Sequence, residues 1–273
     1  MMKSFRIGAV ALATLASAPA LAAPASFVSV RGTDTGNCAA ITTPCRTFAY
    51  ALGQTSTHGE IFAIAPGDYG PVTINKSISI TGTVDGAGIT SAATVSGLGN
   101  IAHIIVDAGA NGLVYLTGLT LNGSVAPGFP AGVVVREGTR VIIRDCAIRN
   151  YSFGINVATG GASTLLDDAF SRAPIFIGPE SRRGVIHRVS AANAQGDAIT
   201  LFGSGGTMIS ESSISGSGSG VFARTHFFLT RSAISNNANF GVSDQGVVNS
   251  AHNNLIRGNG VNVQNPVNNI GTR

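Results

Sequence analysis

Residues 145–157 read DCAIRNYSFGINV, and a related string, RSAISNNANFGVSD, returns at residues 231–244. Both strings place a short apolar segment, a polar corner and a Phe-Gly pair in the same order. On either side of them, apolar residues recur about every 22 positions in two series that keep step with each other. The first series is Val133, Ile155, Ile177, Ile199, Val221 and Val242, and the second is Ile148, Phe170, Ala192, Ile214, Ile234 and Ile256. One structural unit of about 22 residues therefore repeats along the chain.

The composition agrees with a repeat built from strands. The chain has 36 glycines, 6% aromatic and 11% charged residues, which is typical of many short strands joined by tight corners. Leucine-rich repeats have a similar length, but the chain lacks their fixed leucine and asparagine pattern. In a coil of three short strands, each strand pairs in parallel with its counterpart one turn away, at about 4.8 Å. Each turn then buries its apolar side chains against those of the next turn, which explains why the sequence recurs.

The turns from about Val114 to Asn265, with the opening GTDTGNCAAITTPCRTFAYAL at 32–52, resemble the right-handed parallel β-helix proteins of the pectin-lyase-like superfamily. The resemblance implies an all-β fold, a right-handed single-stranded parallel β-helix with about 22 residues per turn and a short N-terminal capping helix. Thr43 would cap that helix with Pro44 in its first position, and Phe48, Ala49 and Leu52 would face the coil. The expected divisions are a signal peptide at 1–22, a Cys loop and capping helix at 23–58, the β-helix at 59–265 and a tail at 266–273.

The first residues predict export. Lys3 and Arg6 precede an apolar run that ends in the small residues before Ala22, which is the order of a secretory signal cleaved near Ala22. The run is too short to span a membrane comfortably, and no other segment is long enough. We therefore expect a secreted or periplasmic protein. The formal net charge of +4 falls further when the signal leaves, so the mature chain lacks the basic stripe expected for a nucleic-acid partner.

Three cysteines remain to be placed. In an oxidising compartment, Cys38 and Cys45 predict a local disulfide, because the alternative of a metal site lacks a second Cys or His pair. Cys146 is left over in an apolar strand. It predicts a buried, inert thiol rather than a reactive one.

Candidate chemistry lies in the outward positions of the repeat. Three residues before the second series, Asp145 and Asp167 would lie on adjacent turns, about 5 Å apart. Such a pair predicts either a calcium site or a pair in which one acid stays protonated for acid-base catalysis, with Asp168 beside it. Arg144 would flank the acids. The alternative is a set of solvated or mutually paired surface charges of little individual importance.

A second candidate cluster is basic. His187 falls in an otherwise apolar column, so it is either a buried histidine with a satisfied hydrogen bond, a sign of a register shift, or a catalytic base. Arg182, Arg183 and Arg188 surround it, and their guanidinium groups suit the carboxylates of an acidic, uronate-containing polysaccharide. A solvated turn is the alternative. Tyr151 and Tyr115 are the only tyrosines in the coil beyond its first turn, and Tyr151 is the one predicted to contact sugar rings.

The resemblance is specific for the fold and leaves catalysis open. Polygalacturonase-like glycosidases carry a Gly-His-Gly and an Arg-x-Lys, and neither occurs here. Calcium-dependent pectate lyases hold acidic ligands beside an arginine, an arrangement that Asp145, Asp167, Asp168 and Arg188 would imitate. The chain has no tryptophan, however, and its connecting loops are short.

We therefore predict a non-catalytic β-helix protein that binds polysaccharide or a surface, with calcium as the one candidate cofactor. A calcium-assisted lyase or a hydrolase acting on acidic glycans is the first alternative, and a structural or assembly element is the second. The sequence makes no prediction of the oligomeric state.

Overall fold

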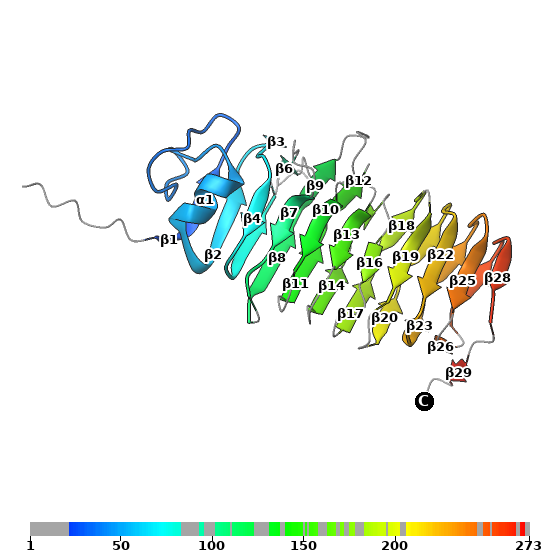
Figure 1. Cartoon of the computed structure of the whole chain (residues 1–273). Helices are drawn as coiled ribbons and strands as arrows, with labels where there is room; N and C mark the ends of the chain where they lie inside the picture. Colours follow the sequence, from blue (N-terminus) through cyan, green and yellow to red (C-terminus); the bar gives the residue numbers. More distant parts are fainter. Residues whose placement is uncertain are drawn as a thin grey trace, which may run out of the picture.

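The computed structural model describes residues 22–82, 93–95, 102–109, 111–122, 131–136, 140–149, 151, 153–157, 163–167, 170–171, 175–177, 183–194, 196–202, 206–244, 248–251, 253–265 and 268–270. Short strands follow one another in a fixed cycle of three and stack along one axis (Figure 1). The paired strands of the described ranges all run parallel, and they form three sheets along the coil. The predicted right-handed parallel β-helix is confirmed. Nearly all of the predicted signal peptide, residues 1–21, lies outside the described residues.

Sheet A forms one side of the coil and is the longest of the three. Its strands, in spatial order, are β1 (Ala23–Val28), β2 (Thr55–Ala63), β5 (Ile78–Thr81), β8 (Leu113–Thr117), β11 (Arg140–Arg144), β14 (Ser163–Asp167), β17 (Arg183–His187), β20 (Thr207–Ser210), β23 (Phe227–Thr230), β26 (Val248–Ala251) and β29 (Asn268–Ile270). The sheet extends beyond the expected limits of the coil, because β1 lies in the segment expected to be a loop and β29 lies in the expected tail.

Sheets B and C complete each turn. Sheet B contains β3 (Gly67–Asp68), β6 (Ala93–Val95), β9 (Leu119–Asn122), β12 (Ala147–Arg149), β15 (Phe170–Ser171), β18 (Ser190–Ala192), β21 (Ser213–Ser215), β24 (Ala233–Ser235) and β27 (Leu255–Arg257). Sheet C contains β4 (Val72–Ile74), β7 (Ala102–Val106), β10 (Ala131–Val135), β13 (Phe153–Val157), β16 (Ile175–Ile177), β19 (Asp197–Leu201), β22 (Ser219–Ala223), β25 (Phe240–Asp244) and β28 (Val261–Val263).

The core is a set of stacked aliphatic columns. In sheet C, successive turns place Val133, Ile155, Ile175, Ile199, Val221 and Val242 in register, and each of these side chains is fully buried. Val and Ile suit this position because branched side chains pack well on a pleated surface. Ile177, predicted for this column, instead pairs with Val157 and Leu201, two residues further along the strand.

The second predicted column needs a one-residue correction in two turns. In sheet B, Ile148 pairs with Ser171 rather than Phe170, and Ile214 pairs with Ala191 rather than Ala192. Because side chains alternate between the two faces of a strand, a slip of one residue exchanges inward and outward positions. The rest of this column is as predicted, with Ile214, Ile234 and Ile256 in register.

Buried polar ladders run through two corners of the coil. Between sheets A and B, backbone N–H groups donate to the next turn's side chain, from Val189 to Ser212 Oγ (3.2 Å), from Ser212 to Ser232 Oγ (3.1 Å) and from Ser232 to Asn254 Oδ1 (2.9 Å). Between sheets B and C, the N–H of Ala194 donates to Ser217 Oγ and that of Ser217 to Asn237 Oδ1, both at 3.1 Å. These bonds satisfy the corner N–H groups that have no partner within a sheet, because a buried backbone N–H group needs an acceptor.

Helix α1 (Phe48–Gln54) lies at the N-terminal end of the coil, where it packs its buried Phe48, Ala51 and Leu52 against the first strands (Figure 1). The predicted cap is wrong: Thr47 caps the helix, accepting from Tyr50 N–H at 3.1 Å, and Ala49 is exposed. A helix that starts at Thr43 is excluded because the backbone of Cys45 is bonded elsewhere. Cys45 donates its N–H to Phe27 O in β1 and accepts from the N–H of Ser29, which follows that strand.

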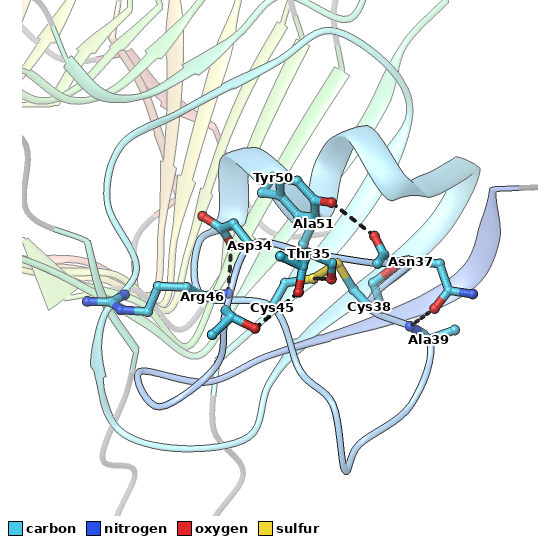
Figure 2. Close-up of a disulfide and its surroundings, with 12 residues drawn as sticks. Asp34, Thr35, Asn37, Cys38, Ala39, Cys45, Arg46, Tyr50 and Ala51 are labelled. Carbon is cyan, nitrogen blue, oxygen red and sulfur yellow. Dashed lines mark hydrogen bonds between the residues drawn. A yellow bond between two sulfur atoms is a disulfide. The ribbon is translucent and has the colours of Figure 1, made fainter. Parts of the chain in front are cut away.

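The predicted disulfide between Cys38 and Cys45 is confirmed, with 5.2 Å between the Cα atoms (Figure 2). The disulfide joins the two ends of the loop that precedes α1. This loop is also bonded to β1, because the N–H of Phe27 donates to Cys38 O. Asp34 accepts from the N–H groups of Arg46 and Thr47 at 2.8 and 2.9 Å, which fixes the entry to the helix.

Candidate functional site

The residues predicted to form an acidic pair do not lie beside each other. Arg144, rather than Asp145, stands in register with Asp167, and Asp167 is followed on the next turn by His187. We call this register series on sheet A the His187 column: Thr117, Arg144, Asp167, His187, Ser210 and Thr230. The expected Asp145–Asp167 neighbours, which carried the predicted calcium site and acid-base pair, are therefore wrong in register.

Asp145 lies one position further, at the corner that leads from sheet A to sheet B. The equivalent positions on other turns are Gly118, Arg188, Glu211 and Arg231, and all five residues have φ between 45° and 64°. This left-handed conformation turns the chain sharply and ends each strand of sheet A. Arg188 thus belongs to the corner and not to the column of Arg144. Asp168 and Arg182 lie outside the described residues, and Arg183 opens β17.

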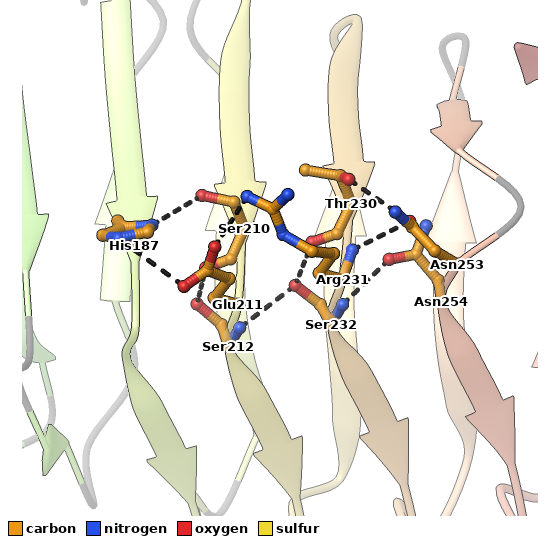
Figure 3. A network of polar contacts seen from close by, with 9 residues as sticks. All are labelled: His187, Ser210, Glu211, Ser212, Thr230, Arg231, Ser232, Asn253 and Asn254. Carbon is orange, nitrogen blue, oxygen red and sulfur yellow. Dashed lines mark hydrogen bonds and ion pairs between the residues drawn. The ribbon is translucent and has the colours of Figure 1, made fainter. Parts of the chain in front are cut away.

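His187 points away from the core, which corresponds to the register shift given as one alternative and not to a buried histidine. Ile186 is the buried residue of this strand and lies in register with Ile209. The His187 Nδ1 atom is 3.0 Å from Ser210 Oγ, and its Nε2 atom is 3.9 Å from Glu211 Oε2 (Figure 3). Glu211 also forms an ion pair with Arg231, with 2.6 Å between Oε1 and Nη2.

The polar network around His187 is suited to holding corners together. Ser210 is 3% exposed, so its hydroxyl is not presented to a substrate as a nucleophile would be. The Glu211 carboxylate is shared between His187 and Arg231, and Asn253 Oδ1 accepts from Arg231 N–H at 2.9 Å and from Thr230 Oγ1 at 3.2 Å (Figure 3). Each contact joins one turn to the next, and surface ion pairs of this kind contribute about 1 kcal/mol or less.

Tyr151, predicted to stack on sugar, is buried. Its hydroxyl contacts Nδ1 of His103, which is itself 3% exposed, and the two rings meet edge to face at 5.2 Å. Burial raises the pKa of Tyr151. The pair is therefore part of the packing between turns and presents no stacking face to solvent.

Sequence reasoning missed a cluster on the outer face of sheet C. Phe222 lies between Val221 and Ala223, both fully buried, so alternation turns its ring outward. Phe202, which follows β19, meets Phe222 edge to face at 5.9 Å. The guanidinium carbon of Arg224 lies 5.2 Å from the Phe202 centroid and 5.7 Å from that of Phe222. The signal in the sequence is the spacing of Phe202 and Arg224, each directly after an apolar strand of consecutive turns.

The same sheet is hollowed at its N-terminal end. A depression of about 330 Å³ lies between α1 and strands β4 and β7, with mostly apolar walls and with Thr73 and His103 as its polar members. Sheet C thus carries an apolar hollow near α1 and an aromatic, cationic cluster further along the coil. Thr200 and Ser243 lie in register on either side of Phe222.

Metal ligands are sparse in the described part of the chain. Within it, no three His, Cys, Asp or Glu side chains are grouped closely enough to share a metal ion. Cys146 is buried as predicted, and burial raises the pKa of its thiol to about 12, so the thiolate that binds metals is disfavoured.

A family model described as "Periplasmic copper-binding protein (NosD)" matches residues 86–272, which is most of the coil. The chain belongs to the NosD family. The family's description places its members in the periplasm, which agrees with the predicted export of this NosD-family chain. Within the described ranges, no helix is both long and apolar enough to cross a membrane.

The crystal structure of pectate lyase Pel9A is similar to the NosD-family chain in fold, with a TM-score of 0.54 and 14% sequence identity. The similarity covers 83% of this chain and 68% of the lyase. At this identity the likeness supports the parallel β-helix fold and leaves the activity open. No curated protein matches the sequence.

Proposed function

We propose that this NosD-family chain is an exported, non-catalytic β-helix protein that binds an extended polysaccharide along the outer face of sheet C. The observation that carries the proposal is the cluster of Phe202, Phe222 and Arg224, in which a guanidinium group lies over two aromatic rings. Aromatic faces pack against the apolar faces of sugar rings, and a guanidinium group pairs with carboxylates in a bidentate manner. The chemistry favours an acidic glycan that contains uronate.

The geometry of the coil suits an extended ligand. Neighbouring strands of sheet C repeat at about 4.8 Å, so a linear polymer along the coil axis meets equivalent positions turn after turn. Thr200 adds a hydroxyl group on the turn before Phe222, whereas the Ser243 hydroxyl on the turn after it is buried and donates to Gln264 Oε1 at 2.6 Å. The hollow near α1 lies on the same sheet and would extend the contact toward the N-terminal end.

Two features support binding without cleavage. The predicted acid pair is separated by its register, since Asp167 lies opposite Arg144 and His187. The nearest analogue of a catalytic base, His187, is bonded to Ser210 and faces Glu211 on a different sheet from the aromatic cluster. The lyase and the assembly element are alternatives that the experiment below separates from binding.

Copper, named in the family description, does not enter the proposal. Copper in proteins is held by imidazole, thiolate and thioether groups. Among the described residues, His103 contacts Tyr151, His187 lies between Ser210 and Glu211, and Cys146 is buried with a raised pKa. These side chains are apart from one another and do not make a copper site.

Retention of the mature protein on immobilised polysaccharides tests the proposal. We expect retention on uronate polymers, and Phe222→Ala should weaken it about tenfold, the equivalent of about 1.4 kcal/mol, a loss in the range of one aromatic contact. Arg224→Ala should weaken binding to uronate polymers more than to neutral ones. Leu255→Ala removes an apolar side chain that is even more exposed than Phe222, from sheet B, and should leave retention unchanged.

The same samples distinguish the alternatives. Incubation with uronate polymers, with and without calcium, should give no rise in the absorbance of unsaturated products. A rise would identify a lyase and overturn the non-catalytic proposal. Absence of retention on every polymer would remove polysaccharide binding and favour the assembly element.

A further inference from the structure

Sheet A carries a series of apolar residues in one register column, which we call the sheet A ladder. Its members are in register on six successive strands, β8 to β23: Tyr115, Ile142, Leu165, Val185, Met208 and Phe228. Tyr115, Met208 and Phe228 are 37%, 41% and 46% exposed. Ile142 is only 8% exposed, so the exposed members lie toward the two ends of the series. Exposed apolar side chains that share one face mark interaction surfaces in soluble proteins.

The ladder has polar limits at both ends. Glu60 and Ser79 occupy the same column before Tyr115, and Asn249 and Asn268 occupy it after Phe228. The column is therefore apolar in its middle and polar over two turns on each side. Its pattern reads the same in both directions along the coil, with an aromatic residue at each end of the apolar part.

We propose that the sheet A ladder is the interface of a homodimer in which two copies pack sheet A against sheet A with their coil axes antiparallel. A two-fold axis parallel to the strands and centred on the ladder places Tyr115 opposite the second copy's Phe228. It also places Ile142, which is only 8% exposed, opposite the more prominent Met208. A surface that is complementary to itself in this way is what an isologous dimer requires.

The charges beside the ladder select the antiparallel arrangement. Arg140 and Arg144 are both exposed and flank Ile142 on its two sides. With parallel coil axes, the two-fold would bring Arg140 of one copy opposite Arg144 of the other, and like charges would face each other. With antiparallel axes, Arg144 instead faces Ser210, three turns further along the coil.

The size of the contact sets its strength. Six strands at about 4.8 Å give an apolar strip about 24 Å long and one side chain wide, which buries less area than a standard protein interface and is typical of weak, transient contacts. We therefore expect a reversible dimer whose population rises with concentration.

Sedimentation velocity of the mature protein at concentrations up to about 100 μM tests the proposal. We expect dimers in the unmodified protein and monomers in Met208→Glu and Phe228→Glu, because each change buries a carboxylate at the interface. Both side chains face solvent in the monomer, and unchanged melting curves would confirm folding. Thr200→Glu, an outward change on sheet C, should leave the dimer intact. Monomers at every concentration, or dimers that survive both changes in the ladder, would overturn the proposal.

Cysteine cross-linking tests the arrangement. A mixture of the Tyr115→Cys and Phe228→Cys variants should form mixed disulfide dimers on oxidation, whereas either variant alone should form few. Self-linking of Phe228→Cys would require parallel axes and overturn the arrangement. Polysaccharide retention should be unaffected by Met208→Glu, since the proposed glycan surface lies on sheet C. If the unmodified protein is monomeric and Met208→Glu nevertheless loses retention, the ladder is a glycan surface and the dimer proposal is overturned.

Discussion

The backbone N–H of Ser217 donates to Oδ1 of Asn237 at 3.1 Å, although the two residues are 20 positions apart in the chain. Asn237 continues this series of corner hydrogen bonds, because its own N–H and its side-chain Nδ2 both donate to Asn259 Oδ1, at 3.0 and 2.8 Å. Ser217 and Asn237 are 3% and 2% exposed. The corner between sheets B and C is therefore held by side chains that replace the strand pairing missing there.

Asn237→Ala should lower the free energy of unfolding by about 1 to 3 kcal/mol. The change leaves the buried N–H of Ser217 without its acceptor, and the cost of an unsatisfied buried donor has this size. Denaturant unfolding followed by circular dichroism measures the difference. Asn239→Ala is the matched control, because Asn239 is exposed in the same turn and its backbone groups are unchanged. Equal losses in the two variants would contradict a role for the buried ladder.

Arg231→Asn should be more stable than Arg231→Val by about 1 to 2 kcal/mol. Arg231 has φ of 45° at the corner between sheets A and B, and asparagine tolerates this conformation while a β-branched residue does not. Both variants lose the ion pair with Glu211, so their difference isolates the backbone effect. Thermal melting of the two proteins provides the measurement. A more stable valine variant would show that the corner relaxes out of the left-handed region.

Sequence spacing predicted the coil but not its register in the middle turns. The step from Val133 to Ile155 equals the average repeat, whereas the step from Ile155 to Ile175 is two residues shorter and the next is two longer. A corner can gain or lose residues at little cost while the strands remain paired. Periodicity alone therefore assigned Ile177 where Ile175 lies.

A separate slip of one residue in sheet A misplaced the predicted site. Asp145 was expected in register with Asp167, but Arg144 takes that place. Such a shift exchanges the faces of a strand, which explains why His187 lies on the surface although its predicted column was apolar. The disulfide and the burial of Cys146 were predictable because they depend on local spacing and composition. The cluster around Arg224 forms through contacts between turns. Only the register of the strands brings its residues together, and the sequence spacing did not give that register.

Replacing both Cys38 and Cys45 with serine should destabilise the N-terminal end of the coil by about 2 kcal/mol, given a separation of 7 residues in the chain. The loss should be local, because the disulfide loop bonds to β1 through Phe27 and Ser29. Hydrogen exchange should accelerate in β1 and α1 and remain unchanged in β22 and β25. A uniform acceleration over all turns would instead show that the coil unfolds as one unit from this end.

Alkaline pH should destabilise the fold in part through Cys146. Burial raises the pKa of this thiol from 9.0 to about 12, so the folded chain keeps its proton where the unfolded chain loses it. The resulting contribution is intact below pH 9 and is lost progressively as the pH rises toward 12. Between pH 8 and pH 10, unfolding free energy should fall by about 1 kcal/mol less in Cys146→Ala than in the unmodified protein. Thiol labelling at pH 8 provides an independent measurement: the native chain should react slowly and the unfolded chain quickly. Rapid labelling of the native chain, or equal pH slopes in the two proteins, would show that the thiol is accessible to water.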